Sequence, residues 1–528
     1  MTSNSGILRR FETAVERDQY SEDREDGIGD VQDEVPSDLP DFEEEPARPR
    51  SPSFSLLIDP LAGLIVLCGI LGLAYALWTT PRLERVAEPE RGLALIVSRT
   101  MDLEEALNRT ADWEQILFNA LSGGVSEQDE AIVWYRELAS ATRIPLVEMY
   151  LSILEAEAGL KDRVVARMEA WKSREEPFPL YSRLIRAGYL REALQPDEEF
   201  VLQAELAEAL PAGWFYDRVA LRLATLGQDE ALRVSTTEWA ERRSLELLQR
   251  ARGLIAIEVG VLVAGAIVLI FLVARSGYGR PGRDAGQGQM DSWPLRIGER
   301  TQPPPWSGKG GALVLLRGSA AAVLVVLAFG FVGVREPLVK ILMTPLVNLP
   351  LLWLVYVYLF KPSGLGFAGA FGLWPLTRGW TRLPLAVLCL TAAGLGVDWA
   401  ISLGGQSLGI TLHWTDWFDP ELVWGDGLQA GTSFLEYTIY APLFEEILFR
   451  GLLFATLRRK FGFGGSATLS AGIFALAHGY GVLGLVTVWW SGMIWAWGYE
   501  KTGSLLPSIL AHSLNNLLVC SSIVLILR

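Results

Sequence analysis

Long apolar segments follow one another almost without interruption from residue 312 to residue 528. A run of about 20 apolar residues is long enough to cross the hydrocarbon core of a bilayer as a helix. Inside lipid the backbone must satisfy its own hydrogen bonds, so such segments form helices. Together with two earlier apolar segments, the pattern predicts an all-α polytopic membrane protein with about nine transmembrane helices.

A long polar region separates the two earlier spans. The first transmembrane helix is predicted within residues 54–80 and the second within 254–274. The other seven are predicted near residues 313–334, 341–360, 383–401, 429–450, 465–480, 482–499 and 504–527.

The composition agrees with a membrane protein and excludes other classes. Half of the residues are hydrophobic and only 20% are charged, against about 25% in soluble domains. The net charge of −15 argues against a nucleic-acid partner, which would need a basic surface. The three cysteines all lie in apolar runs, so we expect neither a disulfide framework nor a cysteine-based zinc site.

Three polar regions complete the predicted organisation. Residues 1–53 hold 15 acidic and six basic residues with little apolar periodicity, which predicts a disordered acidic tail. Residues 82–252 carry apolar residues three and four apart, which predicts helices. The Gly- and Pro-rich residues 275–311 are predicted to form a flexible linker before a membrane domain at 312–528.

The pattern of residues 82–252 fits two architectures. Short helical hairpins suggest a tetratricopeptide-like repeat, yet no 34-residue period is defined, so an irregular helical bundle is equally consistent. The region contains no histidine and no cysteine. We therefore expect a module that binds a protein partner or acts as a spacer, without catalytic chemistry of its own.

Basic residues between the spans predict the orientation. One side of the nine-span arrangement receives Arg48 and Arg50, the six Lys and Arg residues between 275 and 309, Lys361, Arg378, Arg382, and Arg458 to Lys460. Loops rich in Lys and Arg remain in the cytoplasm. The N-terminus is therefore predicted to be cytoplasmic in a cell membrane, with residues 82–252 and an acidic loop around Asp416 to Asp426 on the outside.

Histidine is the residue that points to chemistry. The chain has three, and His478 and His512 lie inside predicted spans. A third predicted span carries the paired carboxylates Glu445 and Glu446 followed by Arg450. Ionisable groups at membrane depth cost a few kcal/mol or more, so they usually mark a function.

Helical spacing gives each motif one shared face. Glu446 and Arg450 are four apart and can form an ion pair, while Glu445 is turned by about 100° and is less committed. Phe474 and His478 lie one turn apart, as do His512 and Asn516. A carboxylate, two imidazoles and an amide around one wet cavity supply a base for water and donors for an oxyanion. No HExxH motif is present, which argues against an ordinary zinc protease of that type.

These three motifs resemble those of a known family. EExxxR at Glu445–Arg450, FxxxH at Phe474–His478 and HxxxN at His512–Asn516, in this order on successive spans, are similar to the CAAX prenyl protease and bacteriocin-processing (CPBP or Abi) family of intramembrane endopeptidases. The resemblance covers about residues 380–528, and every motif position is kept. It implies a peptide-bond hydrolase with its active site inside the membrane, acting on a peptide or a membrane-protein substrate.

The resemblance also implies roles for the motif residues. Glu445 with His478 would activate the attacking water, and His512 and Asn516 would stabilise the oxyanion or position the substrate. Glu446 and Arg450 would hold the helix, and Phe474 would support the site. A glutamate-based mechanism is favoured, and the alternative is one divalent metal ion, zinc, held by Glu445, His478 and His512.

Two other functions remain as alternatives. One is a non-catalytic membrane scaffold, such as an immunity or partner-binding protein that uses residues 82–252, and it predicts decayed motifs. The other is a proton-coupled transporter, which predicts broken helices and an internal duplication.

The remaining unusual residues receive structural interpretations. Charges near span ends are assigned to the membrane interface, and this group comprises Glu258, Arg317, Asp398 and Glu436. His413 is assigned to a surface aromatic cluster. A tryptophan stripe is assigned to packing and to the interface, and it comprises Trp489, Trp490, Trp495 and Trp497.

Overall fold

The fold is known from a computed structural model that describes residues 53–122, 127–190, 196–277, 295–298, 302–332, 337–374 and 379–528. All regular elements within these residues are helices, which confirms the all-α prediction. They belong to one compact unit, Pro49–Arg528. The predicted acidic tail lies outside the described residues, apart from its last position.

Six of the described helices are long and apolar enough to cross a membrane. They are α1 (Ile58–Thr79), α10 (Glu230–Gly277), α11 (Gly308–Val332), α12 (Pro337–Val355), α14 (Gly379–Ser407) and α21 (Leu506–Leu527). The protein is thus a multi-pass membrane protein. Three other predicted spans coincide with helices that are shorter or more polar, so the total of nine stays a prediction.

Those three segments contain most of the chemistry. Residues 429–450 fall on α16 (Gly427–Leu435), α17 (Ala441–Glu445) and two π-helical turns, while the other two segments are α19 (Phe463–His478) and α20 (Val482–Thr502). Glu445, Glu446 and Arg450 lower the hydropathy of the first segment, α19 has only 16 residues, and tryptophan and glycine lower the hydropathy of α20.

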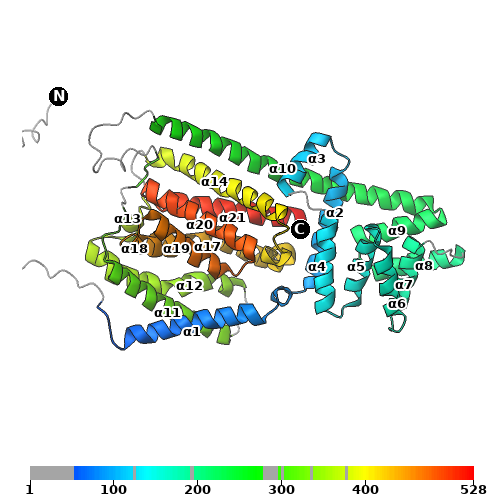
Figure 1. Cartoon of the computed structure of the whole chain (residues 1–528), viewed down its shortest axis with the longest axis horizontal. Coiled ribbons are helices and arrows are strands. Elements are labelled where there is room, and N and C mark those ends of the chain that lie inside the picture. The colour runs from blue at the N-terminus through cyan, green and yellow to red at the C-terminus, as the bar shows by residue number, and fades with distance from the viewer. Residues whose placement is uncertain are drawn as a thin grey trace, which may run out of the picture. The chain divides into compact units, whose positions relative to one another are not determined.

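Helix α10 joins the extramembrane helices to the membrane helices without a break. Its 48 residues correspond to roughly 70 Å at 1.5 Å per residue. The first part contacts α2 and α9, and the apolar part runs beside α14 (Figure 1). A Cβ at Gly265 would lie 2.2 Å from the Cβ of Ala392, so glycine permits the close contact of α10 with α14.

The region at 82–252 is a group of helices packed around α5. Its helices before α10 are α2 (Pro89–Leu107), α3 (Asp112–Ser122), α4 (Glu127–Ala141), α5 (Pro145–Glu157), α6 (Lys161–Trp171), α7 (Phe178–Leu190), α8 (Pro196–Ala209) and α9 (Trp214–Gly227). Helix α5 contacts α4, α6, α7 and α9, and nearly all its residues from Val147 to Leu154 are buried. We call α2–α9 with the first part of α10 the helical domain; whether it is a repeat stays open.

The core of the helical domain continues into the membrane region. The loop after α14 contains α15 (Pro420–Trp424), and Trp414, Phe418 and Leu422 of this loop share the apolar core of the helical domain. The last turns of α21, at Ile523 and Leu527, join the same core. Burial of the aromatic side chains of residues 408–426 attaches this segment to the helical domain. We call it the outer loop, after its predicted orientation.

His413 shows that one interpretation of this loop was wrong. The predicted surface aromatic cluster is instead buried, with His413 only 8% exposed. Its ring lies edge-on to Trp134 of α4, with centroids 6.1 Å apart, and its Nε2 lies 3.2 Å from a carboxylate oxygen of Glu137. Tertiary packing against α4 covers aromatic residues that the sequence alone leaves in a surface loop.

The opposite end of the membrane helices gathers basic loops. Arg382 donates to the carbonyl of Arg296 at 2.9 Å, and Arg459 donates to the carbonyl of Pro304 at 3.3 Å. These contacts bring basic residues of the linker, of the start of α14 and of the turn before α19 to one end of the membrane helices. At residues 295–298 and 302–311 the predicted flexible linker differs from the structure: Ile297 is fully buried and its N–H donates to the carbonyl of Thr502 at 2.8 Å.

Arg317 also differs from its interpretation as an interface residue. Its Nε lies 2.6 Å from a carboxylate oxygen of Asp59, which is 1% exposed. The ion pair joins α11 to the start of α1, two elements whose contact the sequence did not predict.

Candidate active site

The segment that carries the paired carboxylates is one nearly continuous helical rod. An acidic cap starts it: the side chain of Asp426 accepts hydrogen bonds from the N–H groups of Leu428 and Gln429, and the backbone N–H of Asp426 donates to Oε1 of Gln429. The rod then passes through π-helical turns at η5 (Glu436–Tyr440) and η6 (Glu446–Phe454). π-Helical turns are rare and frequently occur at functional sites. Glu445 ends α17 and Glu446 begins η6.

Glu446 is the buried centre of the polar cluster. One of its oxygens, Oε1, lies 2.8 Å from Nη1 of Arg450 and 3.0 Å from Nδ1 of His512. Glu446 and Arg450 are both fully buried. The predicted ion pair is therefore present, and it also binds a histidine from α21, 66 residues further along the chain.

The hydrogen bond of His512 defines which of its ring nitrogens donates. An ionised carboxylate only accepts hydrogen bonds, so Nδ1 of His512 carries a proton and donates it to Glu446. The other nitrogen, Nε2, lies 3.8 Å from an oxygen of Glu445. The two neighbouring carboxylates therefore face the two nitrogens of one imidazole, although their helix positions differ by about 100°.

His478 has the complementary arrangement. Its Nδ1 lies 2.8 Å from the carbonyl oxygen of Phe474, which can only accept, so Nδ1 donates and Nε2 keeps a free lone pair in the neutral ring. A lone pair on a partly exposed imidazole suits a general base.

The ring of Phe474 lies among the other site residues. The guanidinium of Arg450 sits 4.2 Å from its centroid. The rings of His478 and His512 meet it edge-on, with centroids 4.7 Å and 6.0 Å away. Phe474 is 2% exposed, so it is a buried spacer that sets the relative positions of two imidazoles and one guanidinium.

Asn516 lies at the edge of this group. Its Nδ2 donates to the carbonyl of Tyr437 at 2.9 Å and thereby ties α21 to η5. The amide oxygen and the second N–H have no hydrogen bond within the described part of the chain. The structure thus shows Asn516 as a tie between helices with polar capacity to spare.

Three further residues belong to the site, and sequence reasoning missed their roles. Trp495, 1% exposed, stacks on His512 with an interplanar angle of 16° and centroids 6.0 Å apart. A Cβ at Gly492 would lie 2.9 Å from Nη2 of Arg450, so α20 approaches this guanidinium closely because the residue is glycine. Tyr480 has its ring 5.4 Å from that of His478 and lies within electrostatic range of Glu445. Of these three residues, only Tyr480 had a signal in the sequence, the GYG turn beside His478.

Glu436 also lies closer to the chemistry than its interpretation as an interface residue suggests. Thr344 of α12 donates to one of its oxygens, and its second oxygen is buried without a hydrogen bond among the described residues. It lies within electrostatic range of Glu445. The site therefore contains three carboxylates, of which Glu446 has the charged partners.

The side chains do not fit the proposed zinc set. Among the described residues, no three His, Cys, Asp or Glu side chains converge in a way that could hold a metal ion. The misfit lies in how the side chains are placed and not in the ring nitrogens, because the engaged Nδ1 atoms of His512 and His478 leave Nε2 available on each ring. We therefore derive no chemical step through a metal from this geometry.

A family comparison agrees with the motifs. Residues 429–518 match the family model of the Rce1-like type II CAAX prenyl endopeptidases. The chain carries an Rce1-like domain. The match contains all seven motif residues, from Glu445 to Asn516, and it supports a protease embedded in a membrane. No curated protein and no solved structure matches the chain.

Proposed function

We propose that the Rce1-like domain is an intramembrane endopeptidase that uses a glutamate-activated water and no metal ion. The observation that carries this proposal is the placement of Glu445 and Glu446 at the two nitrogens of His512. One carboxylate holds the imidazole, and the other, 30% exposed, is free to act on water. A scaffold would have no need for this division of roles.

The reaction follows from these assignments. Glu445, assisted by the free Nε2 of His478, takes a proton from water while the water oxygen bonds to the carbonyl carbon of the substrate. The oxyanion that forms accepts hydrogen bonds from Nε2 of protonated His512 and from Asn516. Glu445 then passes its proton to the leaving nitrogen, and the C–N bond breaks to give a carboxylic acid and an amine.

Glu446 and Arg450 act as positioning residues in this scheme, because Glu446 accepts the Nδ1 hydrogen of His512 and Arg450 holds Glu446 in place.

The substrate would enter from the side of the helical domain. Gly481, three residues after His478, donates to Asp416 of the outer loop at 3.2 Å. With the predicted orientation, the substrate is an extracytoplasmic peptide or membrane-protein segment.

The test compares new protein termini by mass spectrometry in cells that express the wild type, Glu445→Ala or His478→Ala at equal membrane levels. Termini that disappear in both variants support the protease, and at least a thousandfold loss of cleavage is expected for Glu445→Ala. Glu230→Ala, an exposed carboxylate at the start of α10, is the matched control and should leave all termini unchanged.

Two outcomes would contradict the proposal. Identical termini in all strains would favour the scaffold, with the helical domain as its partner-binding part. Full loss of cleavage by the purified protein after chelation, with recovery on adding zinc, would show that the metal-free mechanism is wrong.

A further inference from the structure

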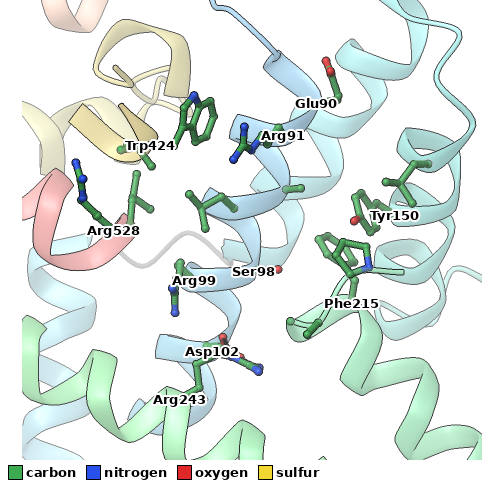
Figure 2. Close-up of a pocket in the computed structure, with 18 of the residues that line it drawn as sticks. Glu90, Arg91, Ser98, Arg99, Asp102, Tyr150, Phe215, Arg243, Trp424 and Arg528 are labelled. Carbon is green, nitrogen blue, oxygen red and sulfur yellow. Dashed lines mark hydrogen bonds and ion pairs between the residues drawn. The ribbon is translucent and has the colours of Figure 1, made fainter. Parts of the chain in front are cut away.

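A cavity of about 490 Å³ lies where the helical domain meets the outer loop, away from the motif residues. Figure 2 shows its walls: Arg91, Arg99 and Asp102 project from α2, Tyr150 and Phe215 come from the helical domain, and Trp424 comes from α15. Its volume falls within the range of ligand pockets in proteins.

The cavity is amphipathic. Apolar side chains from both regions cover much of its wall; they include Leu95, Leu146, Val147, Tyr150, Phe215 and Trp424. Four arginines and two acids also line it, and two of these arginines pair with Asp217 and Glu88 just outside the wall. Such a wall favours a ligand with both apolar and charged groups.

Most of the charges at the cavity are already paired. Arg243 donates to both oxygens of Asp102, at 2.6 and 2.7 Å, and to Asp217 at 2.6 Å. Arg91 lies over the Trp424 ring at 4.5 Å and pairs with Glu88 at 3.1 Å. Arg528 donates to the carbonyl of Leu422 at 3.3 Å.

Arg99 is different, because none of the described carboxylates lies within ion-pair distance of it. Asp102, three residues along α2, is fully engaged by Arg243. The half-buried position lowers the pKa of Arg99, because desolvation disfavours its charge more strongly than the nearby charge of Asp102 favours it, and because Arg243 repels it. A guanidinium in this situation has unused donors that match a carboxylate bidentately.

We propose that this cavity binds the C-terminal carboxylate of a short apolar peptide, with Arg99 as the carboxylate-binding residue. The volume accommodates about three or four residues, and the aromatic walls receive the last side chains. Hydrolysis of a peptide bond creates such a carboxylate. That the cavity receives a product of the enzyme therefore rests on the proposed protease function, whereas peptide binding in the cavity does not.

Two sources of an anion compete with a peptide. A fatty acid offers the same carboxylate with an alkyl chain, and inorganic phosphate offers charge without apolar groups. The cavity walls come largely from extramembrane helices and carry aromatic and small apolar side chains, which favours the peptide.

The test uses the full chain in detergent with Glu445→Ala in the background, so that no cleavage occurs and binding is measured separately from catalysis. Isothermal titration with acetyl-Ala-Leu-Phe should show saturable 1:1 binding, and its C-terminal amide should bind at least tenfold more weakly. Arg99→Met should weaken the acid tenfold or more and leave the amide unchanged, while Arg99→Lys should lie between.

Arg242→Met is the matched control, because Arg242 lies on α10 over the exposed Trp239 and does not line the cavity. It should leave the binding of both peptides unchanged. Equal affinities for acid and amide, an acid affinity that Arg99→Met does not change, or binding of laurate or phosphate without binding of the peptide would each overturn the proposal. Hydrogen exchange of α2 in Arg99→Met shows whether the helix is still folded.

Discussion

Two arginine–carboxylate groups, one in the helical domain and one in the membrane region, are built differently. In the helical domain, Arg243 makes three hydrogen bonds to Asp102 and Asp217. In the membrane region, Arg450 makes one hydrogen bond to Glu446, and its Nε and Nη2 are buried without partners among the described residues. Buried polar groups are nearly always satisfied, so the unsatisfied group is the one that requires a functional explanation.

Under the proposed function, the first group is a structural ion pair and the second positions His512 for catalysis. The helical-domain group uses its charges to join α2, α9 and α10, and little bonding capacity is left. The membrane group shares one carboxylate oxygen between Arg450 and His512 and leaves the other oxygen free. Four predictions test how the two regions differ.

The largest effect is expected for Arg450→Met. The substitution leaves Glu446 charged and buried with only His512 as a partner, and breaking a buried pair in this way costs about 3–5 kcal/mol. Proteolysis should fall at least a hundredfold and thermal stability in detergent should drop clearly. Arg450→Met with Glu446→Gln should recover much of the stability but not the activity; recovery of activity would show that the pair is merely structural.

Arg243→Met should destabilise the helical domain by about 2–4 kcal/mol, because two buried carboxylates lose their partner. Hydrogen exchange in α2, α9 and α10 measures the effect. Cleavage of a small peptide by the intact fraction should stay within about twofold of wild type. A loss as large as that of Arg450→Met would contradict the distinction between the two groups.

A third prediction concerns pH and the helical domain. Burial near Glu130 and Glu104 raises the pKa of Glu127 to about 7. Because the pKa of Glu127 is higher in the folded state than in the unfolded chain, the neutral carboxyl group stabilises the folded protein. This contribution to the free energy of unfolding is complete below about pH 4.5 and is lost as the pH rises through 7. Glu127→Gln should remove on the order of 1–3 kcal/mol of this pH dependence. Hydrogen exchange of α4 at several pH values, corrected for intrinsic rates, is the measurement; an unchanged pH profile would contradict the assignment.

The smallest effect is expected at the contact between the two regions. Asp416→Ala removes the acceptor of the Gly481 N–H beside the His478 turn. The turnover rate should fall about threefold to tenfold with little change in KM, because a small displacement of a catalytic group costs rate. Asp416→Asn keeps an acceptor and should restore most of the rate. Equal rates for all three proteins would show that the outer loop does not position the catalytic turn.

Hydropathy and motif spacing were enough to predict an all-helical membrane protein and its candidate site. The spacing of Glu446 and Arg450 predicted their ion pair, since it depends only on local helix geometry. The order of the three motifs led to the family that the comparison found over residues 429–518. Local periodicity and residue chemistry carry this information directly.

Other features depended on contacts between distant parts of the chain. Sequence periodicity placed Glu445 and Glu446 on different faces, but both meet His512 because α21 packs across the rod. Trp495 and Gly492 became site residues, and His413 became buried, only through packing of one helix on another. Local spacing therefore predicted the helices, the residues that share a helix face and the candidate chemistry. Which helix faces meet depends on long-range apolar burial, which does not follow from local spacing.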